Sequence, residues 1–192
     1  NGLRMSLTIL GNEFIIIINY SILILRPEFT IFWAIFITSF LTFNTCASGL
    51  YIVTTQKGEV KSAMLASWVT QASLRPLGVA IAVSKERAIA SLMQLGDRFV
   101  LNVLGEDNYQ GLMKHFLKRF PPGANRFEGI KTYPASNGSP ILVDALAYME
   151  CEITSRMDCG DHWVIYSTVK TGRVANVNAL TAVHHRKMGN HY

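Results

Sequence analysis

The sequence has few cysteines and lacks the common glycine-rich nucleotide motifs. Its three cysteines, Cys46, Cys151 and Cys159, leave one thiol unpaired in any intramolecular scheme. No CxxC pair or Cys/His spacing is typical of zinc, so we expect a reducing compartment and no structural metal. Neither GxGxxG nor GxxxxGKS/T occurs, so the chain carries neither a dinucleotide-binding strand-helix fingerprint nor a P-loop.

Charged residues are also scarce. They make up 16% of the 192 residues, and the formal net charge is +5. A positive balance suits a nucleic acid, an anionic cofactor or a membrane surface. Because no run of five basic residues is present, the sequence does not predict nucleic-acid binding. The length predicts one domain with a core of its own and some additional segment.

Apolar residues are concentrated near the N-terminus. The runs at 14–25 and 31–43 are nearly all apolar, and Arg26, Pro27 and Glu28 separate them. Each run is shorter than the roughly 20 residues that span a bilayer as a helix. The interruption makes a single span across both runs costly. The segment fits a membrane hairpin or anchor, buried strands, a signal peptide without a clear cleavage site, or a non-native start.

We therefore expect two parts in the chain. Residues 1–48 form an apolar extension, and residues 49–192 form the functional domain. The domain is expected to be cytoplasmic, with membrane association only if residues 14–43 are a true anchor.

From Gly49 onward the pattern is that of a β-rich domain. A hairpin is predicted around the polar turn that contains Gly58, and helices are predicted after Ser84 and after a capping residue, Asp107. The remaining strands are expected at 78–83, 99–104, 141–154, 162–169 and 172–177. Because helices do not alternate with strands throughout, we expect a mainly β protein, an antiparallel barrel with peripheral helices.

The stretch 62–85 is the predicted ligand site. Its small and hydroxyl-bearing residues let a flat ligand approach the backbone and hydrogen-bond its polar edge, and Trp68 can add an aromatic wall. Ser84 follows a predicted buried strand where a helix is expected to begin. Ser84 and Lys85 can hold a phosphate there. In the alternative interpretation, Ser84 only caps the helix and Lys85 is a solvated residue.

Other polar residues are assigned structural roles. Asn102 interrupts a predicted strand and is expected to satisfy backbone groups, and His115 is expected on a helix surface rather than as a ligand. His184, His185 and His191 have no nearby carboxylate or thiolate in sequence, so no metal site is predicted.

Four motifs, taken in chain order, resemble a known family. They are AMLASWVTQASLRPLGVAIAV at 63–83, FVLNVL at 99–104, MEC at 149–151 and GDH at 160–162. Together they resemble the flavin reductase-like, FMN-binding split-barrel family, above all the C-terminal flavin reductase module of cyanobacterial diflavin flavoproteins, which are flavodiiron proteins. The resemblance covers about residues 49–192.

The sequence departs from the family pattern in two ways. Family members commonly carry two prolines where this chain has Pro76-Leu77, and many have a hydroxyl residue in place of Leu65. The diiron and flavodoxin modules of the diflavin flavoproteins are absent from the sequence. The resemblance therefore does not predict that this chain reduces oxygen to water.

The resemblance implies a homodimeric split β-barrel that binds FMN and accepts hydride from NAD(P)H, feeding electrons to a flavodiiron partner. It implies roles for Ala66, Ser67 and Trp68 along the flavin ring, and for Thr70, Gln71, Ser84 and Lys85 along its ribityl and phosphate groups. His162 is expected beside the nicotinamide, and Arg186 with His185 is expected to close the pocket. Two alternatives remain: an FMN-binding electron-transfer module without NAD(P)H oxidase activity, and a membrane-anchored partner protein.

Overall fold

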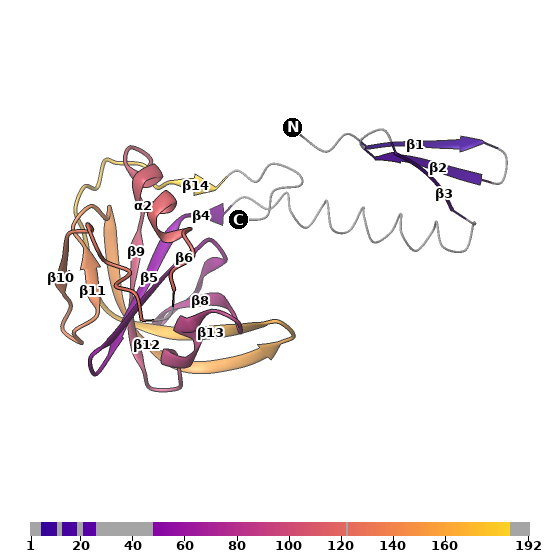
Figure 1. The fold of residues 1–192 in the computed structure, drawn as a ribbon. Coiled ribbons are helices and arrows are strands. Elements are labelled where there is room, and N and C mark those ends of the chain that lie inside the picture. Colours follow the sequence, from indigo (N-terminus) through magenta and orange to yellow (C-terminus); the bar gives the residue numbers. More distant parts are fainter. Residues whose placement is uncertain (1–4, 11–12, 19–20, 26–47, 122, 185–192) are drawn as a thin grey trace. The chain divides into compact units, whose positions relative to one another are not determined.

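The computed structural model describes residues 5–10, 13–18, 21–25, 48–121 and 123–184 (Figure 1). Ser48–His184 forms one compact unit, and the described strands near the N-terminus belong to another. In that other unit β1 (Met5–Leu10), β2 (Glu13–Ile18) and β3 (Ser21–Leu25) pair antiparallel in sequence order.

Two predictions concern this N-terminal part. The apolar run at 14–25 falls on β2 and β3, while the run at 31–43 lies outside the described residues. Among the residues that are described, no helix is long and apolar enough to cross a membrane.

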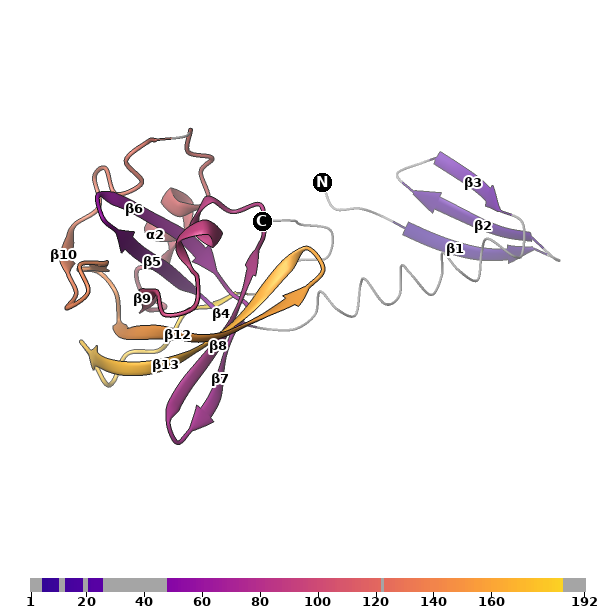
Figure 2. The same ribbon diagram turned by 90° about the horizontal axis from the view of Figure 1, so that it is seen from below.

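The larger unit is built on a seven-stranded antiparallel sheet (Figure 2). Its strands, in sheet order, are β6 (Val60–Ala66), β5 (Tyr51–Lys57), β9 (Arg98–Val103), β12 (Ala147–Cys159), β13 (His162–Val174), β8 (Leu77–Ser84) and β7 (Val69–Leu74). Because β6 and β7 follow each other in sequence but lie at opposite ends of this order, the sheet curls back on itself.

Short elements complete the unit. Two small antiparallel sheets pair β10 (Thr132–Pro134) with β11 (Pro140–Leu142), and β4 (Ser48–Gly49) with β14 (Val183–His184). The helices are the 3-10 helix η1 (Ala88–Leu92) and the α-helix α2 (Tyr109–Phe116). The prediction of a mainly β protein with peripheral helices is confirmed.

Local sequence explains the hairpin of β5 and β6. Lys57 pairs with Val60, so Gly58 and Glu59 form a two-residue turn, and Gly58 has a φ of 59° that favours glycine. Both faces of β5 are buried, since Val53 packs in the main apolar core and its neighbour Ile52 packs in a second cluster. The main apolar core includes Val53, Met64, Ala66, Val79, Ile81, Val83, Phe99, Leu101, Ile153 and Ile165.

Both helix starts differ from the sequence prediction. Ser84 is the last residue of β8, where it pairs with His162, and the five-residue η1 begins only after Arg87. The predicted helix start at Ser84 is therefore wrong, because Ser84 pairs with His162 and so continues strand β8. Asn108, not Asp107, occupies the N-cap position of α2, and no side chain caps it.

The boundaries of the long strands also differ. The expected strand at 141–154 is divided into β11 and β12, and the two strands expected after residue 162 form one continuous β13. The connection of β12 to β13 is only Gly160-Asp161, where Gly160 has a φ of 74°. Polar residues that suggested a wider turn lie on the exposed end of this hairpin, where solvent tolerates them.

Asn102 is fully buried in β9 and has the structural role predicted for it. Its amide nitrogen donates to the Ile52 carbonyl at 3.0 Å and to Thr54 Oγ1 at 3.2 Å, and its oxygen accepts from the Leu142 backbone nitrogen at 2.9 Å. The side chain therefore ties β9 to β5 and to β11.

Candidate functional site

Three of the predicted site residues meet where β8 ends and β13 begins. Ser84 pairs with His162 across these strands, and the ring centroids of His162 and Trp68 are 4.9 Å apart. Trp68 is held in place because its carbonyl accepts a hydrogen bond from the Ala82 nitrogen at 2.9 Å. Strand pairing therefore joins Ser84 and His162, which are 78 positions apart in sequence (162 − 84 = 78), and it brings the Trp68 ring against His162.

His162 is held on its other side by a carboxylate. Its Nδ1 lies 2.8 Å from Asp161 Oδ1, and this hydrogen bond keeps the pKa of the exposed Asp161 carboxyl below its usual range. A histidine fixed through Nδ1 can present Nε2 to a ligand. The arrangement gives an aromatic surface, Trp68, beside an oriented imidazole.

Lys85 is engaged with a carboxylate. Its Nζ lies 2.7 Å from both carboxylate oxygens of Asp158 and 4.7 Å from the centre of the Trp163 ring. The hydrogen bond from Lys85 lowers the pKa of the Asp158 carboxyl. The guanidinium of Arg156 lies 4.3 Å from the centre of the same Trp163 ring. A phosphate at Lys85 would therefore have to compete with Asp158.

The other predicted residues are more dispersed. Ala66 is buried in the core cluster, and Ser67 is buried with no hydrogen-bond partner for its Oγ among the described residues. Thr70 and Gln71 are exposed on β7. Thr70 pairs with Ala80, four residues before Ser84, which at roughly 3.3 Å per residue places them about 13 Å apart along the strand direction. One phosphate cannot contact both places.

Two predicted residues lie outside the described part of the chain. These are Arg186 and His185, which were expected to close the pocket. Within the described part, no group of three or more His, Cys, Asp or Glu side chains is placed to hold a metal ion. His115 lies on α2, where its Nε2 is 2.8 Å from the carbonyl oxygen of Arg126.

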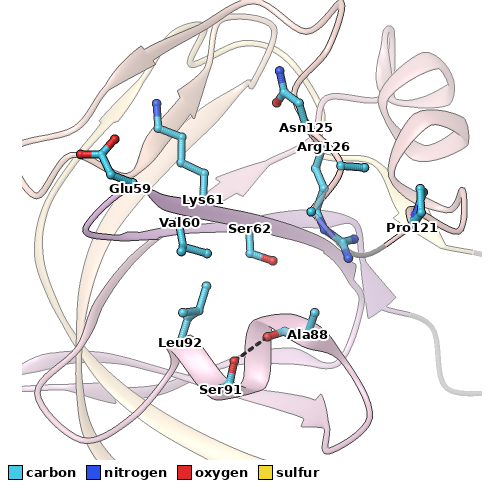
Figure 3. A pocket seen from close by; sticks show the side chains of 12 residues that line it. Glu59, Val60, Lys61, Ser62, Ala88, Ser91, Leu92, Pro121, Asn125 and Arg126 are labelled. Atoms are coloured by element: carbon cyan, nitrogen blue, oxygen red, sulfur yellow. Dashed lines mark hydrogen bonds between the residues drawn. The ribbon is translucent and has the colours of Figure 1, made fainter.

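A cavity of about 720 Å³ is lined by Ser62, the first residue of the predicted ligand stretch 62–85, but by none of the residues assigned to the flavin or the nicotinamide (Figure 3). Its walls come from the end of the β5–β6 hairpin, from η1 and from the loop after α2. The lining residues are Glu59, Val60, Lys61, Ser62, Ala88, Ser91, Leu92, Pro121, Gly123, Ala124, Asn125 and Arg126. Sequence reasoning missed this cavity because its three walls are separate in sequence and carry no common motif.

Comparison with solved structures defines the class of fold. The flavin reductase component BorF of a bacterial two-component tryptophan halogenase is 28% identical with a TM-score of 0.66, covering 77% of this chain and 92% of its own. The nitrilotriacetate monooxygenase component B homologue from Mycobacterium thermoresistibile is 25% identical with a TM-score of 0.67, covering 80% and 84%. The predicted flavin reductase-like split β-barrel is confirmed.

The family profile described as "Flavin reductase like domain" matches residues 43–190, and the chain belongs to this family. Among curated relatives, a diflavin flavoprotein of Nostoc sp. (strain PCC 7120) is 81% identical over 146 residues. Diflavin flavoprotein A 1 of Synechocystis sp. (strain PCC 6803) is 71% identical over 146 residues. Each match covers 76% of this chain, so the predicted resemblance to diflavin flavoproteins is also confirmed.

The chain spans about a quarter of the length of these relatives, 25% and 26% respectively. The similarity therefore identifies a flavin reductase-like module. The activity of the whole relatives is not assigned to it by the match.

Proposed function

We propose that this module binds FMN and transfers hydride from NAD(P)H to the bound flavin. Family membership supports a flavin oxidoreductase, and the observation that carries the site is the meeting of Trp68, Ser84 and His162 at one end of β8 and β13. When bound, FMN would supply the acceptor for the hydride that nicotinamide C4 gives up, with one proton taken from solvent.

The protein's part in this reaction is mainly geometric. Trp68 is 37% exposed and offers a flat surface beside the flavin ring, and His162 orients the nicotinamide through the nitrogen that Asp161 does not engage. Holding two rings in contact can account for several kcal/mol of a barrier without a strong acid or base. Ser84 and Lys85 hold the phosphate. To do so, the Lys85 ammonium group leaves Asp158 and binds the phosphate of the ligand.

The proposal extends to partners. A homodimer is implied by the family resemblance, and the β7–β8 hairpin, which extends away from β5 and β6 in Figure 2, exposes Leu74 and Leu77 for such a contact. Because the curated relatives are named diflavin flavoproteins, we propose that the reduced flavin passes electrons to a flavodiiron partner.

The test uses the full chain, freed of flavin and reloaded with FMN. NADH and NADPH are added separately without oxygen, and the flavin absorbance near 450 nm is followed. Bleaching with either nucleotide supports the reductase. A flavin that stays oxidised with both nucleotides would favour the electron-transfer module instead.

A second measurement tests the phosphate contacts. Replacing Ser84 and Lys85 by Ala should weaken FMN binding at least tenfold while riboflavin, which lacks the phosphate, is unchanged, because a charge-assisted hydrogen bond contributes about 1.5–3 kcal/mol. Equal weakening of both ligands would contradict the phosphate assignment.

A further inference from the structure

The cavity beside η1 is not used by the proposed function. Strand alternation divides the β6 residues that line it: Val60 and Ser62 point toward η1, while Lys61 points to the other side of the strand, as does Glu59 in the preceding turn (Figure 3). Leu92 faces Val60 from η1. One side of the cavity is therefore apolar, formed by the exposed Val60 and the half-buried Leu92. This side lies on the face of β6 away from Glu59, the one acidic residue that lines the cavity.

Ser62 is the buried polar group of this interior. The residue is 4% exposed, and its Oγ has no hydrogen-bond partner among the described residues. Nearly all buried hydroxyls in proteins are hydrogen-bonded, because an unmet bond is costly. The nearby Ser91 hydroxyl already donates to the Ala88 carbonyl at 2.9 Å. A ligand group that hydrogen-bonds Ser62 would remove this cost.

Arg126 supplies the positive charge. Its side chain descends from the loop after α2, and Figure 3 shows the guanidinium ending on the same side of β6 as the Ser62 hydroxyl. Burial lowers the pKa of Arg126, and the charge of nearby Arg87 lowers it further. Two guanidinium groups that repel each other are stabilised by an anion placed between or beside them. A planar guanidinium also matches the geometry of a phosphate.

We propose that this cavity is a second binding site, which takes the phosphate of a nucleotide at Arg126 and Ser62 and the nucleotide's ring along Val60 and Leu92. The size of about 720 Å³ lies within the range of small-molecule sites and far exceeds the space that inorganic phosphate needs. The site goes beyond the proposed function, because none of the residues assigned to the flavin or the nicotinamide lines it.

Calorimetric titration of the flavin-free full chain tests the proposal, with ADP, adenosine and inorganic phosphate as probes. The wild type should bind ADP at least tenfold more tightly than adenosine or inorganic phosphate. Arg126→Gln should weaken ADP at least tenfold and leave adenosine and FMN unchanged, and Ser62→Ala should weaken ADP several-fold. Arg119→Gln is the matched control, since Arg119 is exposed and outside the cavity.

Three results would overturn the proposal. The site is contradicted if the wild type does not bind ADP at millimolar concentration. It is also contradicted if the wild type, Arg126→Gln and Ser62→Ala bind ADP with equal affinity. Competition between FMN and ADP, with FMN weakened by Arg126→Gln, would make the cavity part of the flavin site. Circular dichroism checks folding, and if Arg126→Gln does not fold, Ser62→Ala alone decides. If the wild type binds FMN but not ADP, the second site is contradicted while the proposed flavin site stands.

Discussion

At the scale of single residues, His162 is placed by contacts on two sides. Asp161 binds its Nδ1, and the ring of Trp68 lies against it. We predict that His162→Ala slows anaerobic flavin reduction tenfold or more while FMN affinity stays nearly constant, because only nicotinamide positioning is lost. Stopped-flow bleaching near 450 nm, read against FMN titrations of the same variant, measures both quantities.

His115→Ala is a suitable control for this prediction. His115 lies on α2 and contacts Phe116, Phe120 and the Arg126 carbonyl rather than the end of β8. His162→Asn, which keeps a hydrogen-bonding side chain, should recover part of the lost rate. A rate that is the same in wild type and His162→Ala would show that His162 is only a strand residue with a local hydrogen bond.

The two described thiols should differ in reactivity. Burial raises the pKa of Cys151 to about 12, with the Glu150 charge adding to the effect, whereas Cys159 is exposed at the end of β12. Because the thiolate is the reactive form, iodoacetamide at pH 8 should label Cys159 and leave Cys151 unlabelled in the native protein. Peptide mass spectrometry measures this, and both cysteines should react in urea. Comparable native labelling of the two would contradict the burial argument.

The same pKa shift has a consequence for stability. The thiol of Cys151 ionises near pH 9 in the unfolded chain but only near pH 12 in the folded one. Its contribution is therefore fully present below pH 9 and declines as the pH rises from 9 toward 12, because the unfolded state is the one that gains from ionisation. Urea unfolding of Cys151→Ala should show a shallower loss of stability over this range than the wild type.

At the scale of elements, local patterns predicted several strands but not all of their boundaries, and they did not predict β7. The β-branched run of β5, followed by a polar turn that contains Gly58, is sufficient to place the β5–β6 hairpin. Alternating burial of Val79, Ile81 and Val83 matches the predicted strand in β8. The order of motifs then identified the family. These features are readable because each depends on neighbours in sequence.

Other features could not be read locally. The turn after Ser84 has helical spacing at Ala88 and Leu92, but pairing of Ser84 with His162 extends the strand and leaves only a 3-10 helix. The cavity at Arg126 depends on three segments that meet only in the folded chain. Likewise, nothing near Lys85 in sequence shows that Asp158 will engage it.

Asn102 shows what one buried side chain contributes to several elements. We predict that Asn102→Leu destabilises the fold by about 2–4 kcal/mol, because the Ile52 carbonyl and the Leu142 nitrogen lose their buried partner. Urea unfolding should show a lower midpoint with an unchanged slope. Asn108→Ala, which removes one exposed hydrogen bond to the Asp144 carbonyl, should cost less than about 1 kcal/mol. Equal losses would mean that the Asn102 contacts contribute little.

At the scale of the whole molecule, the two units lead to a prediction about truncation. We expect residues 49–192 to fold, bind FMN and dimerise without residues 1–48, because the sheet and its core are complete within Ser48–His184. Circular dichroism, FMN titration and sedimentation should match those of the full chain. An insoluble or monomeric fragment beside a well-behaved full chain would place the N-terminal segment in the core. Membrane fractionation of the full chain separately tests for an anchor.

The pairing of β8 with β13 also affects how the protein is made. His162 leaves the ribosome 78 residues after its partner Ser84, since 162 − 84 = 78. Because ribosomes add about 5–20 residues per second, β13 is made on the order of 4–16 s after the β7–β8 hairpin with which it pairs. During synthesis the apolar edge of this hairpin is open to strands of other nascent chains, the condition that favours mispairing. We expect soluble yield to improve at low temperature or with added chaperones, which keep that edge apart from other chains until β13 is complete.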